Sequence, residues 1–551
     1  MERAEIKDRV YRVISQVLKL EPGQIQEGHT FTVDLGAESV QSVELMAGFE
    51  EEFDIEMDED EALQVQNVGR PSTSLPAISS EGRGNAMTDK AARSWPLSAT
   101  QAPNLLDEQF DYSLPPKILF DGPIYEEIAG KVVKFDPQEA LARDLVITDT
   151  TFRDGQQARP PYTVEEQVRL YDMLAKLGGP RGVIRQTEFF LYTKNDRRAL
   201  DECRALGHRY PEITSWIRAD KGDFRLVVEA GVKETGMLTS CSDYHIFLKL
   251  KKNRQQAFDD YLEVVEAAWE AGIRPRCHLE DVTRADIGGF VLPFVAELMR
   301  RSEQVAPELR AKVRLCDTMG FGVTFPGASL PRSIPKLIYR MTHDAGVPPE
   351  CLEWHGHNDF HKVHINGASA WLYGCNALNA TLFGFGERTG NPPLEGAVIE
   401  YIALRGALCG IDTQMIQEIA QYMRAAGVEI PDNYPFVGRD FNTTRAGIHA
   451  GGLRADERIY NIFDTTALFG RPPRVSITDK SGVDGVTIWV NEYLGLKGDE
   501  RLSKIKVHKV ARWVLDQYEV QQRMSAITDE ELELQVKEHL PEHYARRAQS
   551  R

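Results

Sequence analysis

Three short runs of the sequence contain the side chains best suited to catalysis at a metal ion. They are DTTFRDGQQ (residues 149–157), HGHND (residues 355–359) and GFGERTGN (residues 384–391). Together they offer a carboxylate, two imidazoles two positions apart and an amide oxygen, a ligand set that suits a divalent cation and leaves positions open for a substrate. An arginine beside the carboxylate is placed to hold an anionic substrate. HxH alone is a weak signal, but the three runs together, each after an apolar segment, indicate a metal-dependent enzyme.

The segments that must position these runs alternate between short β-rich stretches and helices from about residue 140. Eight such units within about 270 residues predict an α/β fold, a (β/α)8 barrel, whose active site lies at the C-terminal ends of the strands. An open doubly wound sheet is the alternative, and the count of eight favours the barrel. The expected strands are LVITDTT, GVIRQTEFF, ITSWIRA, VKETGMLTS, RPRCHLED, KVRLCDT, CLEWHGHND and ALNATLFG.

Four segments of different character follow one another along the chain. Residues 1–70 have apolar positions at helical spacing and predict a small all-α, four-helix domain. Residues 71–112 are rich in Ser, Pro, Ala and Gly, as in a flexible linker. Residues 113–410 hold the expected barrel, and residues 411–551 are expected to form a helical C-terminal subdomain. Acidic residues are concentrated at the N-terminus, where residues 1–65 carry 17 acidic and 5 basic side chains.

Composition excludes several classes of protein. The 551 residues are too many for one hydrophobic core, so we expect two or three domains. The net charge of −18 argues against nucleic acid or an anionic membrane surface as the main partner. No apolar run approaches the roughly twenty residues of a membrane span. Seven cysteines without a CxxC pair indicate reduced thiols in a cytoplasmic protein.

The run DLGAESVQSVELMAGFEEEF, within an acidic and partly helical segment, resembles the acyl carrier proteins. The resemblance implies that Ser39 carries a 4'-phosphopantetheine arm, attached by a phosphopantetheinyl transferase. The family usually has Asp-Ser-Leu where this chain has Glu38-Ser39-Val40. The alternative is that Ser39 only caps a helix. A coil-like linker of this length spans roughly 35 Å, enough to carry such a domain towards an active site.

The first expected strand ends near Asp154, and the second ends in Glu188. This pattern, together with the HxH and glycine-rich runs, resembles the DRE-TIM metallolyase superfamily over residues 140–490, and more narrowly its 2-isopropylmalate and homocitrate synthases. The resemblance implies that Glu188 orients Arg153 and the waters on the metal. It implies a metal site made by Asp154, His355, His357 and Asn391, and a 2-oxo acid held by Arg153, Gln157 and Thr318.

The same resemblance implies a metal-dependent, Claisen-type acyltransferase that condenses an acetyl thioester with a 2-oxo acid to give a 2-hydroxy acid. The donor is acetyl-CoA or an acetyl group on the chain's own carrier domain. His449 and Tyr460 match catalytic residues that the synthases bring from the C-terminal subdomain, often from the partner subunit, so a homodimer is expected. Glu280 matches an acidic residue that acts as a base or positions water.

Several choices stay open at this level. The ligand set does not select among Zn, Mn and Mg. A lyase of the same superfamily running the reverse reaction, or a non-catalytic carrier and docking protein, are the alternatives to synthesis. Positive residues near expected strand ends predict a 2-oxo acid with a second carboxylate, such as oxaloacetate or 2-oxoglutarate, and an enzyme similar to the Re-citrate synthases. Those residues are Arg185, Arg218, His245, His361 and Lys362.

Overall fold

The computed structural model describes residues 3–32, 34–37, 39–53, 68, 97, 111–157 and 159–550. The chain divides into two compact units. One unit holds residues 105–441 and 463–471, and the other holds residues 1–104, 442–462 and 472–551.

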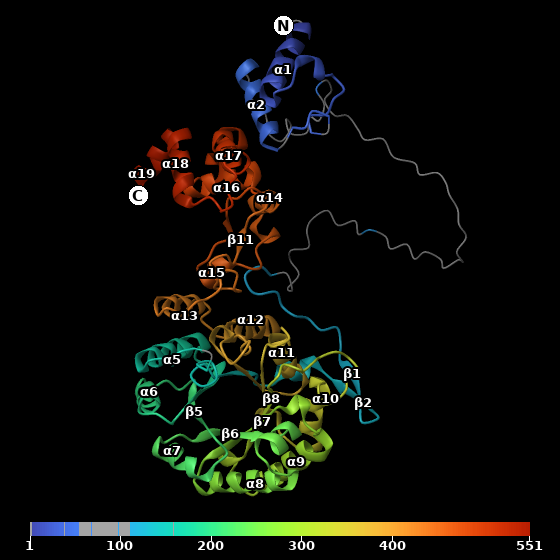
Figure 1. The fold of residues 1–551 in the computed structure, drawn as a ribbon, viewed down its shortest axis with the longest axis vertical. Coiled ribbons are helices and arrows are strands. Elements are labelled where there is room, and N and C mark those ends of the chain that lie inside the picture. Colours follow the sequence, from blue (N-terminus) through green and yellow to red (C-terminus); the bar gives the residue numbers. More distant parts are fainter. Residues whose placement is uncertain are drawn as a thin grey trace, which may run out of the picture. The chain divides into compact units, whose positions relative to one another are not determined.

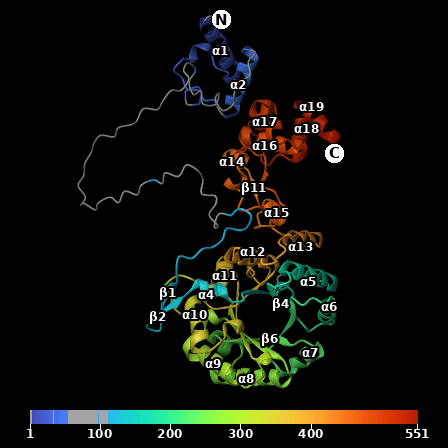
Figure 2. The same ribbon diagram turned by 180° about the vertical axis from the view of Figure 1, so that it is seen from behind.

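The larger unit is built around a closed barrel of eight parallel strands (Figures 1 and 2). The strand order is β10-β3-β4-β5-β6-β7-β8-β9, so each strand pairs with its neighbours in the sequence and the last pairs with the first. Each of the eight expected runs coincides with one strand, to within one residue at the start of β5, which confirms the (β/α)8 prediction. The strands are β3 (Val146–Asp149), β4 (Ile184–Phe189), β5 (Glu212–Ile217), β6 (Glu234–Ser240), β7 (Arg274–Glu280), β8 (Lys312–Asp317), β9 (Leu352–Gly356) and β10 (Ala377–Ala380).

Helices alternate with the strands and surround them (Figure 1). Helix α5 shows why the sequence forms them: a capping box between Thr163 and Glu166 starts it, and Leu170, Leu174 and Leu177 form a buried stripe. A further helix, α13 (Gln414–Ala425), follows the barrel. The barrel helices are α5 (Val164–Gly178), α6 (Lys194–Ala205), α7 (Phe224–Glu229), α8 (Arg254–Glu270), α9 (Leu292–Ser302), α10 (Ile334–Tyr339), α11 (Val363–Tyr373) and α12 (Leu394–Arg405).

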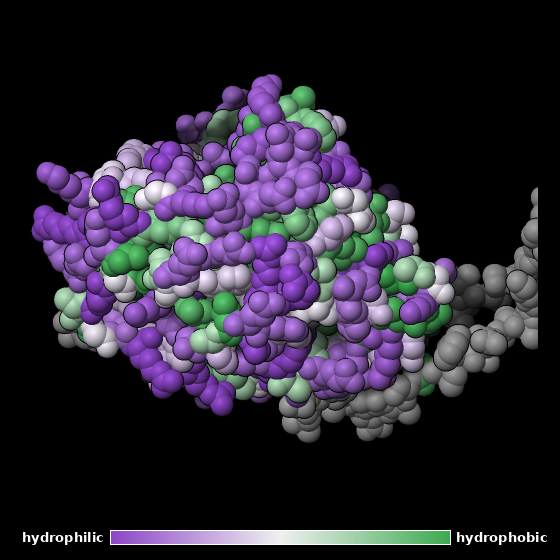
Figure 3. Space-filling view, turned by 90° about the horizontal axis from the view of Figure 1, so that it is seen from below, coloured by the Kyte–Doolittle hydropathy of each residue, from purple (hydrophilic) through white to green (hydrophobic). Residues whose placement is uncertain are grey.

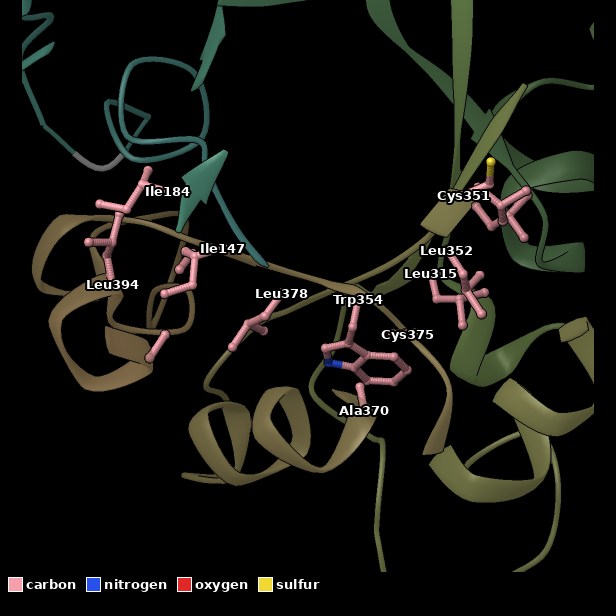
Figure 4. Packing of buried hydrophobic residues seen from close by; sticks show 14 of the residues in the cluster. Ile147, Ile184, Leu315, Cys351, Leu352, Trp354, Ala370, Cys375, Leu378 and Leu394 are labelled. Atoms are coloured by element: carbon pink, nitrogen blue, oxygen red, sulfur yellow. The ribbon is translucent and has the colours of Figure 1, made fainter. Parts of the chain in front are cut away.

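Strand β9 shows how the barrel separates an apolar layer from a polar interior. Trp354 is fully buried and packs in the hydrophobic layer with Ala370 of α11 and Leu378 of β10 (Figure 4). Because side chains alternate along a strand, Glu353 and His355 lie on the opposite face of β9, inside the barrel. The strand therefore anchors the helices with one face and supplies chemistry with the other.

An antiparallel hairpin that the sequence analysis did not identify precedes the barrel. It consists of β1 (Ile124–Ile128) and β2 (Lys131–Phe135) and leads into α4 (Pro137–Ala142). Phe135 makes edge contacts with the rings of Tyr339 and Tyr373, so the hairpin packs on the barrel helices.

The described N-terminal residues of the second unit form α1 (Arg3–Leu18), the short helix η1 (Pro22–Gln24) and α2 (Ser39–Phe53). Val13, Ile14 and Leu45 form their core. The remaining helices expected for a four-helix carrier, and nearly all of the expected linker, lie outside the described residues.

The C-terminal part of the second unit is mostly helical. Helix α18 begins at the capping box formed by Thr528 and Glu531. Within the described ranges, no helix is both long and apolar enough to cross a membrane. The molecular face in Figure 3 is mainly hydrophilic with scattered apolar residues, as is usual for a protein surface. The elements are β11 (Thr443–Thr444), α14 (Gly447–Ala455), β12 (Arg474–Val475), α16 (Gly482–Leu494), α17 (Lys504–Glu519), α18 (Asp529–His539) and α19 (Pro541–Ser550).

Candidate metal centre

The loop that follows β3 places Asp154 at the C-terminal end of the barrel. Asp149, the last residue of β3, accepts hydrogen bonds from the hydroxyls of Thr151 and Thr187, and burial raises the pKa of its carboxyl to about 6. A Cβ atom at Gly155 would lie 2.6 Å from the backbone oxygen of Thr151, so only glycine fits this turn. Asp149 therefore braces the loop, and Asp154 is the carboxylate that faces the centre.

Asp154, His355 and His357 form a buried group of three potential metal ligands. The Oδ2 atom of Asp154 lies 3.6 Å from Nε2 of His355 and 3.7 Å from Nε2 of His357. All three ligand atoms lie within 4.8 Å of one another. Ligand atoms that share one ion at about 2.1 Å lie roughly 3 to 3.5 Å apart, so the donor set and its spacing fit a divalent cation.

Neighbouring groups keep the three ligands in the protonation states that a cation requires. Burial opposes ionisation of Asp154, but the charge of Arg153 and the hydrogen bond from Asn391 outweigh it and lower the pKa of the carboxyl. Burial lowers the pKa of His355 to about 3, so its ring is neutral. A carboxylate and neutral imidazoles are the forms that bind metal.

A buried asparagine on β10 fixes the orientation of the first imidazole. Nδ1 of His355 lies 2.8 Å from Oδ1 of Asn379, and the Asn379 amide donates to the hydroxyl of Thr148 at 2.9 Å. The bond leaves Nε2 of His355 free to coordinate. Asn379 was not predicted from the sequence, although a polar residue inside the apolar strand ALNATLFG was a usable signal.

Asn391, from the glycine-rich run, completes this group of buried polar side chains. Its Nδ2 donates to Oδ2 of Asp154 at 2.7 Å, whereas its Oδ1 is buried with no hydrogen-bond partner among the described residues. A buried acceptor without a partner is costly. Rotation of the amide by 180° exchanges its oxygen and nitrogen and would turn the oxygen towards Asp154, where a bound cation would be its partner. The amide therefore suits a cation site, and its role as fourth ligand stays a prediction.

Arg153 lies beside the three ligands and is held by Glu188. Its Nε donates to Glu188 Oε2 at 2.8 Å and its Nη1 to Asp154 Oδ1 at 3.2 Å. Glu188 is fully buried and also accepts from Arg276 at 2.7 Å and Arg314 at 3.3 Å. Burial opposes ionisation, but three guanidinium groups hold the pKa of Glu188 well below its usual range. Glu188 is therefore ionised and orients the guanidinium group of Arg153 next to the metal site.

The protein matches two known family models. The HMGL-like model matches residues 144–423, and the model of the phosphopantetheine attachment site matches residues 8–70. The chain belongs to the HMGL-like family. It also carries a phosphopantetheine-binding carrier domain at its N-terminus, so both resemblances drawn from the sequence are confirmed.

Three curated relatives of the HMGL-like chain are synthases. Citrate (Re)-synthase of Syntrophus aciditrophicus is 54% identical over 449 residues, which cover 81% of this chain and 69% of the relative. Citrate (Re)-synthase of Clostridium kluyveri is 46% identical over 456 residues, covering 82% of this chain and 97% of the relative. 2-Phosphinomethylmalate synthase of Streptomyces hygroscopicus is 38% identical over 401 residues, covering 71% and 89%.

Three further residues named from the sequence lie on strand ends or loops of the HMGL-like barrel. Glu280, at the end of β7, lies 3.0 Å from Nδ1 of His245 and 3.1 Å from Nζ of Lys249. The Thr318 hydroxyl accepts from the backbone N–H of Asp281 at 2.8 Å. Gln157 is exposed, and its backbone N–H donates to the carbonyl of Asp154. Substrate contacts by Gln157 and Thr318 stay predictions.

The remaining predicted site residues belong to the other unit. His449 lies on α14, and its ring centroid is 4.3 Å from that of Tyr460. Ser39 is the first residue of α2. The structure thus brings His449 and Tyr460 together, and their catalytic roles stay predictions.

The expected positive rim around the HMGL-like centre was partly wrong. Arg185 is the second residue of β4, at the N-terminal end of the barrel, and it pairs with Asp144 at 3.0 Å. A run such as GVIRQTEFF does not reveal where the strand starts, which is why this arginine was assigned to the wrong end. Arg218 follows β5 as expected, but Asp223 neutralises it at 3.0 Å.

The glycine-rich run after β10 depends on backbone conformations that most side chains avoid. Gly390 has a φ of 90°, and a Cβ atom there would lie 2.0 Å from the backbone oxygen of Gly384. Phe383, just before the run, has a φ of 53°, and its N–H donates to Glu395 at 3.0 Å. The Tyr434 hydroxyl donates to the same carboxyl at 2.9 Å. Burial raises the pKa of Glu395 to about 7.

Proposed function

We propose that this protein condenses the acetyl group of a thioester with oxaloacetate and releases citrate. The observation that carries the proposal is the buried Asp154–His355–His357 group with Arg153 fixed beside it by Glu188. The similarity to two citrate (Re)-synthases supports oxaloacetate as the 2-oxo acid. The protein is an acyltransferase of the kind that converts the acyl group into an alkyl group on transfer.

The chain's own residues bind and orient the 2-oxo acid. The Arg153 guanidinium offers forked donors to the substrate carboxylate, and Glu188 keeps that fork from rotating. Asp154, His355 and His357, with Asn391, would hold a zinc, manganese or magnesium ion. When bound, such an ion draws electron density from the substrate ketone and stabilises negative charge on its oxygen.

A base must remove a proton from the acetyl methyl group, which is a weak carbon acid. We assign this step to His449, with Tyr460 against its ring, both supplied by the partner subunit of a homodimer. The resulting carbon nucleophile forms a bond to the ketone carbon, and the ketone oxygen takes up a proton. Water then cleaves the thioester, which gives the free acid and releases the thiol.

Glu280 is suited to position that water. Burial disfavours its ionised form, but hydrogen bonds from His245 and Ser240 and the charge of Lys249 lower its pKa to about 2. A carboxylate with this pKa accepts a hydrogen bond from water at neutral pH but is a weak base. We therefore assign Glu280 a water-positioning role.

The carrier domain supplies a second route for the acetyl group. We propose that a phosphopantetheinyl transferase modifies Ser39 and that acetyl groups reach the centre on this arm as well as on coenzyme A. The expected segments are a carrier in residues 1–70 and a linker in residues 71–112. Tethering of this kind raises the local donor concentration to about millimolar. The seven unpaired cysteines fit a cytoplasmic setting.

The test is a turnover assay with acetyl-CoA and a panel of 2-oxo acids on metal-stripped and metal-reconstituted protein. Oxaloacetate should give citrate and free thiol only after reconstitution, and His357→Ala should lose activity under the same conditions. Full activity after EDTA stripping, or a preference for 2-oxoisovalerate, would overturn the proposal. Mass spectrometry of the holo protein and of a Ser39→Ala variant tests the carrier, because only the former should bear an acetylated arm.

A further inference from the structure

A cavity of about 570 Å³ opens at the N-terminal end of the barrel. Its walls come from the segments before β3, β4 and β5 and from the C-terminal part of α12. The metal ligands lie at the C-terminal ends of the same parallel strands, so the cavity and the metal centre occupy opposite ends of the barrel. The charged residues that line it are five arginines and one carboxylate: Arg143, Arg181, Arg185, Arg209, Arg405 and Asp144.

Two of these arginines, Arg143 and Arg405, are held by backbone carbonyl oxygens. Arg143 donates to the backbone oxygen of Trp371 at 2.5 Å, and Arg405 donates to the backbone oxygen of Arg143 at 2.7 Å. Arg185, by contrast, pairs with Asp144 at 3.0 Å. A hydrogen bond to a carbonyl oxygen orients a guanidinium group without neutralising its charge. Arg143 and Arg405 therefore have no carboxylate partner in the described part of the chain.

The other two arginines stand at the rim. Arg181 and Arg209 are exposed, and neither forms a hydrogen bond or ion pair with any residue in the described ranges. Arg209 lies 5.1 Å from the centroid of the Tyr210 ring, and Arg185 lies 4.9 Å from the same centroid. The Tyr210 ring therefore contacts the guanidinium groups of both Arg185 and Arg209.

We propose that this cavity binds a small anion with two or more negative charges. Five guanidinium groups face one carboxylate, although the chain as a whole carries a net charge of −18, so the cluster does not follow from a basic composition. The forked donors of arginine match the paired oxygens of carboxylates and phosphates equally well. The ligand is therefore a polycarboxylate or a polyphosphate. The volume of the cavity, about 570 Å³, is compatible with a small metabolite of this kind.

The test is calorimetric titration of citrate and, separately, of pyrophosphate into the metal-stripped, full-length protein. Stripping the metal leaves the centre at the other end of the barrel without its main attraction for these anions. The test variant is the double substitution Arg181→Ala/Arg209→Ala, because neither side chain holds a hydrogen bond of the fold. Arg225→Ala is the matched control, since Arg225 is an exposed arginine on α7 that pairs with Glu229 and does not line the cavity.

We expect one probe or both to bind the unaltered protein, at least tenfold more weakly in the double variant, and within twofold of the unaltered protein in the control. Binding should weaken as salt is raised. Tight binding of pyrophosphate alone identifies a polyphosphate site, and of citrate alone a polycarboxylate site. The inference is overturned if neither probe binds at millimolar concentration, or if the double variant binds as tightly as the control.

Discussion

Replacing Asn379 by alanine is expected to weaken metal binding about 10- to 100-fold, because outer partners of metal-bound histidines contribute that much. The change removes the acceptor 2.8 Å from Nδ1 of His355. It leaves a buried N–H without a partner, which costs about 1 to 3 kcal/mol. A 10- to 100-fold loss corresponds to about 1.4 to 2.7 kcal/mol, which lies within the range of that cost.

The assay is titration of metal-free protein with zinc or manganese against a competing chelator, which reports affinity without relying on turnover. Asn379 also bonds Thr148, so the variant should be less stable, and a control must share that loss. Asn366→Ala serves, because Asn366 is another buried asparagine, bonded to the backbone of Gly322. Its metal affinity should stay unchanged. If folded Asn379→Ala binds metal within twofold of the unaltered protein, the orienting role of Asn379 is refuted.

Three other substitutions test other parts of the structure. Arg153→Lys keeps the charge but loses the fork held by Glu188, so kcat/KM for oxaloacetate should fall about 100-fold with metal affinity unchanged, as steady-state kinetics would show. Glu395 has its pKa raised to about 7, so the native state binds its proton more tightly and stability is lost as pH rises from about 4.5 through 7. Glu395→Gln, which can still bond Tyr434, should therefore be more stable than the unaltered protein at pH 8, by about 3 kcal/mol in denaturant titration, and less so at pH 5. Trp354→Ala should cost about 3 to 5 kcal/mol in the same titration, because the side chain is fully buried.

The barrel strands could be predicted because strands buried on both faces are short apolar runs that end in polar residues. The metal ligands could be predicted for a related reason. His355 and His357 are two positions apart along one extended segment, and that spacing places both on the same face. The hairpin of β1 and β2 was missed because the polarity of its residues does not follow their burial: Glu126 is buried, whereas Tyr125 and Val132 are largely exposed.

What the sequence could not reveal are contacts between residues that the closed barrel brings together from distant strands. Glu188 meets Arg276 and Arg314, which are 88 and 126 positions away. His355 meets Asn379 across the β9–β10 pair. The sequence can mark such a residue as unusual, but only the closure of the barrel brings its partner to it.

The charged barrel interior explains how Arg153 can act beside a cation. Arg276 and Arg314 are fully buried, and burying an ion is expensive unless it is paired and hydrogen-bonded. Glu353 provides a second carboxylate for them and lies 2.7 Å from Nε of Arg314. Glu188 stays ionised because it interacts with three guanidinium groups, those of Arg153, Arg276 and Arg314. A metal ion next to Arg153 would repel it. The ionised Glu188 counters that repulsion and holds the arginine beside the metal ligands, where we propose that a substrate carboxylate binds. The interior ion network therefore allows two positive centres to flank the dianionic 2-oxo acid that we propose as substrate.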